Sequence, residues 1–322
     1  MKPHPSEVKR LSLEDDRRNM AIALAGAVAI SFSPIIYSLS GVEAGSAAFF
    51  RMLYALPFLA VIAWRVRGAD NRGRRTRWIA VGAGVILGPD MFAYHYAIDM
   101  IGAGLSTLIA NSQVIIVTLM SWLLFKERPN KAIFASIPIV LFGVYLMSGV
   151  GDESAYGVNP RLGVILSIIG AFAYSSFLIL FRYANRELAP APSLQFDATL
   201  GATASLFLLS FGSGNFEMVP TWPGHAWILL LALLAQVLGW IAIAHALPRL
   251  PGSLTSFAIL LQPTLSFIWG ILILAEEPSS QQMLGVVAVV AGSGLGLGVG
   301  EAGDVLAWVE SNAAAAAAGA GA

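Results

Sequence analysis

Two ionisable side chains, Arg51 and Asp90, lie well inside apolar stretches of the chain. A charge at the centre of a membrane-spanning helix costs about 2.5–3.5 kcal/mol, so each of them is a candidate for a water-filled path. Arginine pairs with a carboxylate through two parallel hydrogen bonds, which suits Arg51 to an acidic group of a solute. The alternative is that Arg51 extends to the membrane surface or pairs with an acid inside the protein. Asp90 is suited to bind a proton or an amine, and equally to be a structural acid.

Aromatic side chains follow Asp90 directly. The chain there reads Pro89-Asp90-Met91-Phe92-Ala93-Tyr94-His95-Tyr96. Rings with polar tips suit a cavity that holds an amphipathic solute, so we expect Tyr94, His95 and Tyr96 to line one. The competing interpretation is a tyrosine belt at the membrane interface, since these residues fall in the outer half of the predicted helix.

Amide and indole side chains add further candidates. Gln113 and Gln262 can bind either charge of a zwitterion without adding net charge, or hydrogen-bond between helices for only about 0.6 kcal/mol each. Trp240 lies in mid-span, too deep for an interface anchor, and is therefore a candidate for solute contact. Asp197 lies near the start of its helix and is expected to be solvated.

Other chemistry lacks the residues it needs. The chain has no cysteine, which excludes disulfides and thiolate metal sites. There is no phosphate-binding G-x-x-x-x-G-K loop, no nucleophile–base pair within an apolar stretch, and no His, Asp or Glu spacing typical of a metal site. We therefore expect no catalytic residue, no metal, no cofactor and no nucleic-acid partner.

The elements that must position these residues are membrane-spanning helices. Of the 322 residues, 57% are hydrophobic and 12% are charged, about half the charged fraction of soluble domains. A hydrocarbon core about 30 Å thick needs roughly 20 apolar residues per helix. Such runs predict ten spans: Met20–Leu39, Ser46–Trp64, Trp78–Ile98, Gly102–Phe125, Ala132–Val150, Arg161–Tyr183, Leu194–Phe211, Gly224–Leu247, Gly252–Leu274 and Gln282–Val299. The first run is read as a retained helix, not a signal peptide.

Lysine and arginine set the expected orientation, because they accumulate on the cytoplasmic side. With ten spans and both termini cytoplasmic, 17 of the 19 basic residues fall on that side. The two exceptions are Arg51, inside a span, and Arg161, at the start of one. An error in the number of spans would scramble this alternation from that point onward.

An internal repeat gives a second constraint. LSTLIANSQ (105–113) aligns with LTSFAILLQ (254–262), 149 residues later, which pairs Gln113 with Gln262. KERP (126–129) aligns in the same register with AEEP (275–278), pairing Glu127 with Glu276. Since five is odd, a second five-helix unit must cross the membrane in the opposite direction. The predicted fold is an all-α membrane protein with ten transmembrane helices in two inverted five-helix repeats, at 20–150 and 161–299, an architecture typical of alternating-access transporters. A cytoplasmic tail at 1–19 precedes them, and 311–322 is a low-complexity linker or scar.

The segments FKERP (125–129) and AEEP (275–278) resemble the Glu-x-Pro helix endings of the drug/metabolite transporter superfamily, and of its EamA-type members in particular. The likeness extends over roughly residues 20–300. It implies ten helices in two repeats and export of small metabolites, often amino acids, through a cavity between the halves. The aromatic-rich character is most similar to the bacterial aromatic-amino-acid exporters. The family has no universal motif for substrate binding, so the resemblance assigns no site residue.

These observations predict a secondary transporter in the inner (plasma) membrane that exports an amino-acid-like solute, aromatic or otherwise neutral, by alternating access. Its expected partners are the solute and the bilayer, and nothing in the sequence requires more than a monomer. The alternatives are a carrier of a drug, nucleotide or sugar derivative, a channel, or an intramembrane enzyme. The site is expected at the centre of the bundle, between the third, fourth, eighth and ninth spans.

Overall fold

The computed structural model describes residues 5–126, 129, 131–185, 189–246, 250 and 252–296, and every regular element in that part is helical. The elements are α1 (Pro5–Ser31), α2 (Ser33–Ser40), α3 (Ala44–Val66), η1 (Arg67–Ala69), α4 (Arg74–Ile101), α5 (Ala103–Ala110), α6 (Gln113–Phe125), α7 (Lys131–Met147), α8 (Pro160–Ala184), α9 (Ala191–Gly212), α10 (Gly224–Leu231), η2 (Ala232–Gly239), α11 (Trp240–Ala246), α12 (Gly252–Leu274) and α13 (Ser280–Gly296). Glu127 and the tail at 311–322 lie outside the described residues.

Within the described part of the chain, six helical segments are long and apolar enough to cross a membrane. They are Arg17–Ser40, Ala44–Ala69, Ala103–Phe125, Pro160–Ala184, Ala191–Gly212 and Gly224–Ala246, and the apolar helices Lys131–Met147 and Leu260–Leu274 are shorter. Large apolar side chains cover the outside of the bundle, among them Leu208, which is 71% exposed, and Leu123, which is 68% exposed. A surface of this kind is stable against lipid tails and not against water. The protein is therefore a multi-pass membrane protein.

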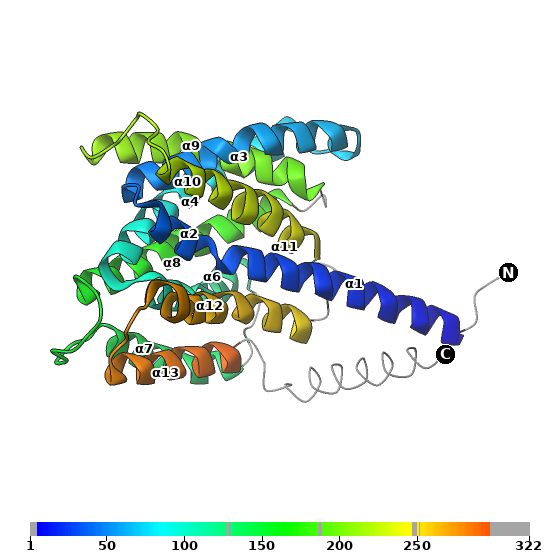
Figure 1. Ribbon diagram of the computed structural model, residues 1–322. Helices are drawn as coiled ribbons and strands as arrows, with labels where there is room; N and C mark the ends of the chain where they lie inside the picture. Colours follow the sequence, from blue (N-terminus) through cyan, green and yellow to red (C-terminus); the bar gives the residue numbers. More distant parts are fainter. Residues whose placement is uncertain are drawn as a thin grey trace, which may run out of the picture.

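The helices lie side by side along one common direction (Figure 1). One edge of the bundle is formed by α3 and α9, which pack together, and the opposite edge by α7 and α13. Between these edges, α4 packs along both α8 and α9. Glycines allow the closest approach, since a Cβ atom at Gly84 of α4 would overlap the carbonyl oxygen of Ala198, and one at Gly201 of α9 would overlap that of Val81. Small residues at such crossings let helices associate by close backbone packing.

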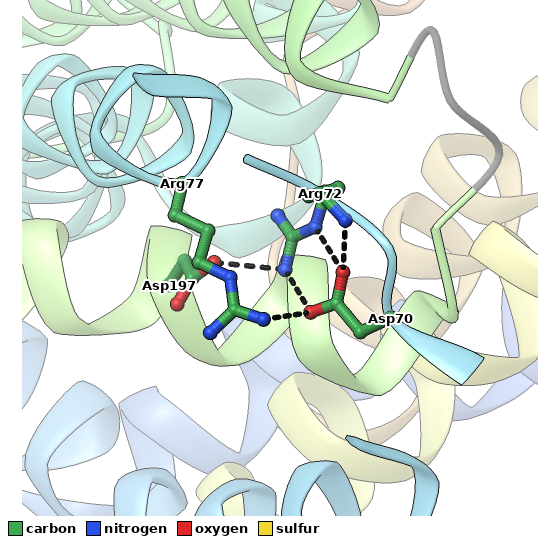
Figure 2. A network of polar contacts seen from close by, with 4 residues as sticks. All are labelled: Asp70, Arg72, Arg77 and Asp197. Atoms are coloured by element: carbon green, nitrogen blue, oxygen red, sulfur yellow. Dashed lines mark hydrogen bonds and ion pairs between the residues drawn. The ribbon is translucent and has the colours of Figure 1, made fainter. Parts of the chain in front are cut away.

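Asp197 is not solvated as the sequence analysis expected. Its Oδ2 atom lies 2.9 Å from Nη2 of Arg72, in the connection between α3 and α4. The same guanidinium donates to both carboxylate oxygens of Asp70, over 2.9 and 3.0 Å (Figure 2). Because Asp197 belongs to α9, this network fastens the connection between α3 and α4 to α9.

Glu276 makes a comparable link at the other end of the bundle. It lies in the connection between α12 and α13, where Ala275 has a positive φ of 54°. Its carboxylate is buried and accepts hydrogen bonds from the backbone N–H groups of Ala103 and Gly104 at the start of α5. These N–H groups have no partner within their own helix, so Glu276 caps α5 from 172 residues away.

Candidate functional site

A cavity of about 100 Å³ lies inside the bundle. Its walls come from α1, α2, α3, α4, α5, α6, α8, α11 and α12, so elements from both halves of the chain contribute. The lining residues are Ile30, Ser33, Arg51, Asp90, Met91, Tyr94, Thr107, Ala110, Asn111, Gln113, Tyr174, Trp240 and Gln262. Six of the eight residues proposed from the sequence meet here: Arg51, Asp90, Tyr94, Gln113, Trp240 and Gln262.

Irregular helix geometry surrounds this cavity. The chain breaks between α1 and α2, beside Ser33, where Pro34 stands in the first turn of α2. It breaks again between α5 and α6, which brings Asn111 to the cavity wall. The π-helix η2 ends immediately before Trp240. Irregular helix geometry at membrane depth is tolerated where it lines a cavity, and π-helical turns are frequent at functional sites.

Arg51 and Asp90 are the charged residues of the cavity. Arg51 is 3% exposed and its Nε and Nη1 atoms have no hydrogen-bond partner among the described residues. Asp90 is 4% exposed and its Oδ2 atom likewise has none. The two groups are near enough to interact electrostatically, yet they form no ion pair within the described part of the chain. Gly170 of α8 leaves room for the carboxylate, since a Cβ atom there would lie 3.0 Å from Oδ1 of Asp90.

The aromatic cluster divides between the cavity and its surroundings. Tyr94 lines the cavity, and its hydroxyl lies 2.7 Å from that of Thr107. His95 is buried behind this wall, with Nδ1 2.7 Å from the carbonyl oxygen of Met91 and its ring edge-on to Tyr37. Tyr96 points elsewhere and donates to the carboxylate of Glu43. Consecutive residues of a helix differ in direction by about 100°, so one wall takes only one of the three.

The two glutamines reach the cavity from opposite halves, Gln113 from α6 and Gln262 from α12. Nε2 of Gln262 is 3.4 Å from the hydroxyl oxygen of Ser266, which is long for a hydrogen bond. Trp240 is half-buried, with its ring centroid 6.0 Å from that of Tyr174. The two glutamines that the 149-residue register pairs in the sequence therefore line the same cavity.

Seven lining residues are absent from the sequence-based set of candidates, among them the polar side chains of Tyr174, Asn111 and Thr107. Tyr174 lies in the middle of an apolar run. Like Trp240, it is therefore too deep for an interface anchor and is a candidate for solute contact. Asn111 is 4% exposed and its Nδ2 atom has no partner among the described residues. No sequence pattern marks Thr107, because its place at the cavity depends on its contact with the hydroxyl of Tyr94.

A second cavity, of about 850 Å³, lies among α1, α11, the end of α3 and the start of α9. Its lining is mostly apolar and includes Ile22, Ile62, Pro192, Ile241 and His245. Trp240 lines the central cavity and Ile241, the next residue, lines the larger one, so α11 contributes to the walls of both. Within the described residues, no three His, Asp or Glu side chains are grouped as a metal site would require.

Comparison with known proteins identifies the family to which this chain belongs. The sequence profile of the EamA-like transporter family matches residues 18–149 and 161–297. The chain belongs to the EamA-like transporter family, a branch of the drug/metabolite transporters. The aromatic-amino-acid specificity suggested by its composition has no counterpart in these comparisons.

Individual relatives are more distant. An uncharacterized transporter of Synechocystis is 25% identical over 44% of this chain and 46% of its own length. One of Helicobacter pylori is 26% identical over 53% and 56%, and one of Bacillus subtilis is 24% identical over 57% and 58%. The chain thus spans about half the length of the curated relatives it matches. A solved crystal structure shares the fold with a TM-score of 0.61 and 17% identity, over 87% of this chain and 98% of the other.

Proposed function

We propose that the protein is a secondary transporter that carries neutral amino acids across the inner membrane by alternating access. One observation carries the proposal: Arg51 and Asp90 are buried on the same cavity, each with atoms that no described residue satisfies. Buried charges are paired or hydrogen-bonded in stable proteins, so both groups call for a ligand. A zwitterion supplies a carboxylate for Arg51 and an ammonium group for Asp90.

The remaining lining fits the same class of solute. Gln113, Gln262 and Asn111 offer neutral donors and acceptors, while Tyr174 and Trp240 offer aromatic surface. One arginine and one aspartate give the cavity no net charge, which disfavours a nucleotide or another strongly anionic solute. At about 100 Å³ the cavity is compact, so a neutral amino acid the size of leucine, and still more an aromatic one, would require the surrounding helices to separate.

The proposal includes ten membrane spans in two inverted five-helix repeats. The family profile matches two successive ranges, which favours a duplicated unit. In the proposed repeat α3 corresponds to α9 and α7 to α13, and each of these pairs packs together at one edge of the bundle. The contact of α1 with α12 has its counterpart in that of α8 with α6. Contacts that recur between corresponding helices are what a two-fold axis in the membrane plane produces.

Orientation and direction follow from charge and cavity shape. The basic residues of the connections favour cytoplasmic termini under the positive-inside rule. The 850 Å³ cavity is lined by Ala69, Asn185 and Pro190 from these same connections, which supports an entrance on the cytoplasmic side. Solute would enter there, reach the central cavity, and leave by the opposite face after the two halves move relative to one another. Export is the direction proposed.

Counterflow in proteoliposomes tests the proposal. Vesicles loaded with unlabelled leucine should take up radiolabelled leucine faster than empty vesicles. Neither 3-methylbutylamine, which lacks the carboxylate, nor 4-methylpentanoate, which lacks the amine, should compete. The Arg51→Gln variant should lose its discrimination against the amine, and Asp90→Asn its discrimination against the acid.

Arg161→Gln is the matched control, because Arg161 is exposed at the start of α8 and outside the cavity. It should behave as the wild type. Equal competition by leucine and both analogues would contradict recognition of a zwitterion. An absence of counterflow with every neutral amino acid, in protein that reconstitutes normally, would refute this substrate class.

A further inference from the structure

The connection between α3 and α4 forms a second polar site, remote from the central cavity. Arg72 is buried there, 5% exposed, and binds Asp70 and Asp197 through Nε and Nη2 (Figure 2). Its third guanidinium nitrogen, Nη1, is buried without a partner among the described residues. A buried donor in that situation is unfavourable unless a ligand accepts a hydrogen bond from it. Arg72 also lines a cavity of about 240 Å³.

The walls of this cavity are of two kinds. Arg67 and Arg77 join Arg72 on the side of the connection. Ala60, Ala63 and Phe196 form the side that continues into α3 and α9. The cavity is therefore basic at the end of the bundle and apolar toward the membrane.

Trp64 marks the boundary between these two walls. It is 62% exposed, and the guanidinium of Arg67 lies 4.6 Å from the centre of its ring. Tryptophan prefers the level of the lipid headgroups. Trp78, at the far end of the same connection, is 63% exposed and places a second ring at that level.

The charges of the cavity favour an anion. Asp70 is already bound by Arg72 and by Arg77, whose Nη2 lies 3.4 Å from Oδ2 of Asp70. Asp197 is bound by Arg72, and Arg67 forms no ion pair within the described part of the chain. Three arginines thus face two carboxylates that are both engaged. A planar guanidinium matches the oxygens of a phosphate group.

We propose that this cavity binds the headgroup of an anionic phospholipid in the cytoplasmic leaflet. The phosphate would lie between Arg67 and Nη1 of Arg72, and the acyl chains along the apolar wall formed by Ala60, Ala63 and Phe196. A free phosphate would leave that wall unused. The inference depends on the membrane placement of the connection and not on what the central cavity binds, so the two proposals fail independently.

Native mass spectrometry of the purified protein in detergent tests this site. Phosphatidylglycerol should be retained in preference to phosphatidylcholine. The Arg67→Gln variant should bind phosphatidylglycerol about fivefold more weakly, the loss expected for one arginine near an anionic headgroup. Arg67 is exposed, so its replacement should leave the melting temperature unchanged.

Arg74→Gln is the matched control, since Arg74 is exposed in the same basic region but does not line the cavity. It should retain the affinity of the wild type. An equal loss in both variants would show diffuse attraction to surface charge and overturn the site. Equal retention of both lipids, or displacement of phosphatidylglycerol by an equal concentration of inorganic phosphate, would also overturn it.

Discussion

The carboxylate of Glu276 accepts a hydrogen bond from the backbone N–H of Gly104 at 3.0 Å, although the two residues are 172 positions apart. This contact fastens the connection after α12 to the first turn of α5. In the proposed repeat, it joins the second half of the chain to the first.

The Glu276→Ala variant should therefore lose stability. It leaves the N–H groups of Ala103 and Gly104 buried without acceptors, which costs about 1–3 kcal/mol. Thermal unfolding followed by tryptophan fluorescence in detergent measures the effect. Glu277→Ala removes a neighbouring but exposed carboxylate, so its melting temperature should match the wild type. Equal melting temperatures for both variants would contradict the capping role.

At Arg51, lysine and glutamine should differ in degree. Arg51→Lys keeps the charge but loses the planar pair of donors that fits a carboxylate. Each hydrogen bond to a charged group contributes about 1.5–3 kcal/mol, so Arg51→Gln should lower counterflow at least tenfold and Arg51→Lys by less. Initial rates in proteoliposomes, normalised to reconstituted protein, provide the comparison. If lysine and glutamine both transport at the wild-type rate, Arg51 does not bind the solute.

Trp240 and Tyr94 line the same cavity but should respond differently. Trp240→Ala removes a large aromatic side chain from the wall of the central cavity and should lower transport without lowering membrane expression. Tyr94→Phe keeps the ring and loses only the hydroxyl that faces Thr107, so its effect should be smaller. The apparent KM for leucine separates the two variants. Unchanged transport in both Trp240→Ala and Tyr94→Ala would exclude these residues from the site.

Close packing between α4 and α9 predicts a position effect for glycine. Gly84→Val should destabilise the protein by about 1–3 kcal/mol, because the added carbons overlap the backbone of Ala198. Gly82→Val is the control. Gly82 lies two residues before Gly84 in the same helix, and nothing lies within 4 Å of a Cβ atom built there. Melting temperatures should therefore fall only for Gly84→Val. A similar fall for both would point to helix propensity instead.

The contribution of Asp70 to stability should depend on pH in a defined direction. Hydrogen bonds from Arg72 hold the pKa of Asp70 below its usual value. Its stabilising effect is therefore complete above the usual aspartate pKa of about 3.9 and is lost as the pH falls through the lower folded-state pKa. The melting-temperature difference between wild type and Asp70→Asn should stay constant from about pH 5 to 8 and shrink below about pH 4. A difference that disappears near pH 6 would contradict this pairing.

Much of the central site could be anticipated from sequence. Arg51 and Asp90 were recognisable because an ionisable group inside an apolar run is unfavourable without a function, and Gln113 and Gln262 because the repeat places them in register. The apolar segments themselves follow from composition, since lipid selects continuous hydrophobic runs. Each of these signals depends on neighbours in the chain or on a duplicated pattern.

Only the tertiary structure decided the rest. The helix break at Asn111 and the π-helix before Trp240 leave no mark in hydropathy, because they arise from packing around a cavity. Tyr96 turned to Glu43 and Asp197 to Arg72, partners that lie 53 and 125 positions away in the chain. Composition and periodicity indicate whether a segment is surrounded by lipid or by water. The pairing of buried polar groups depends on contacts between distant segments, and these contacts form only in the folded bundle.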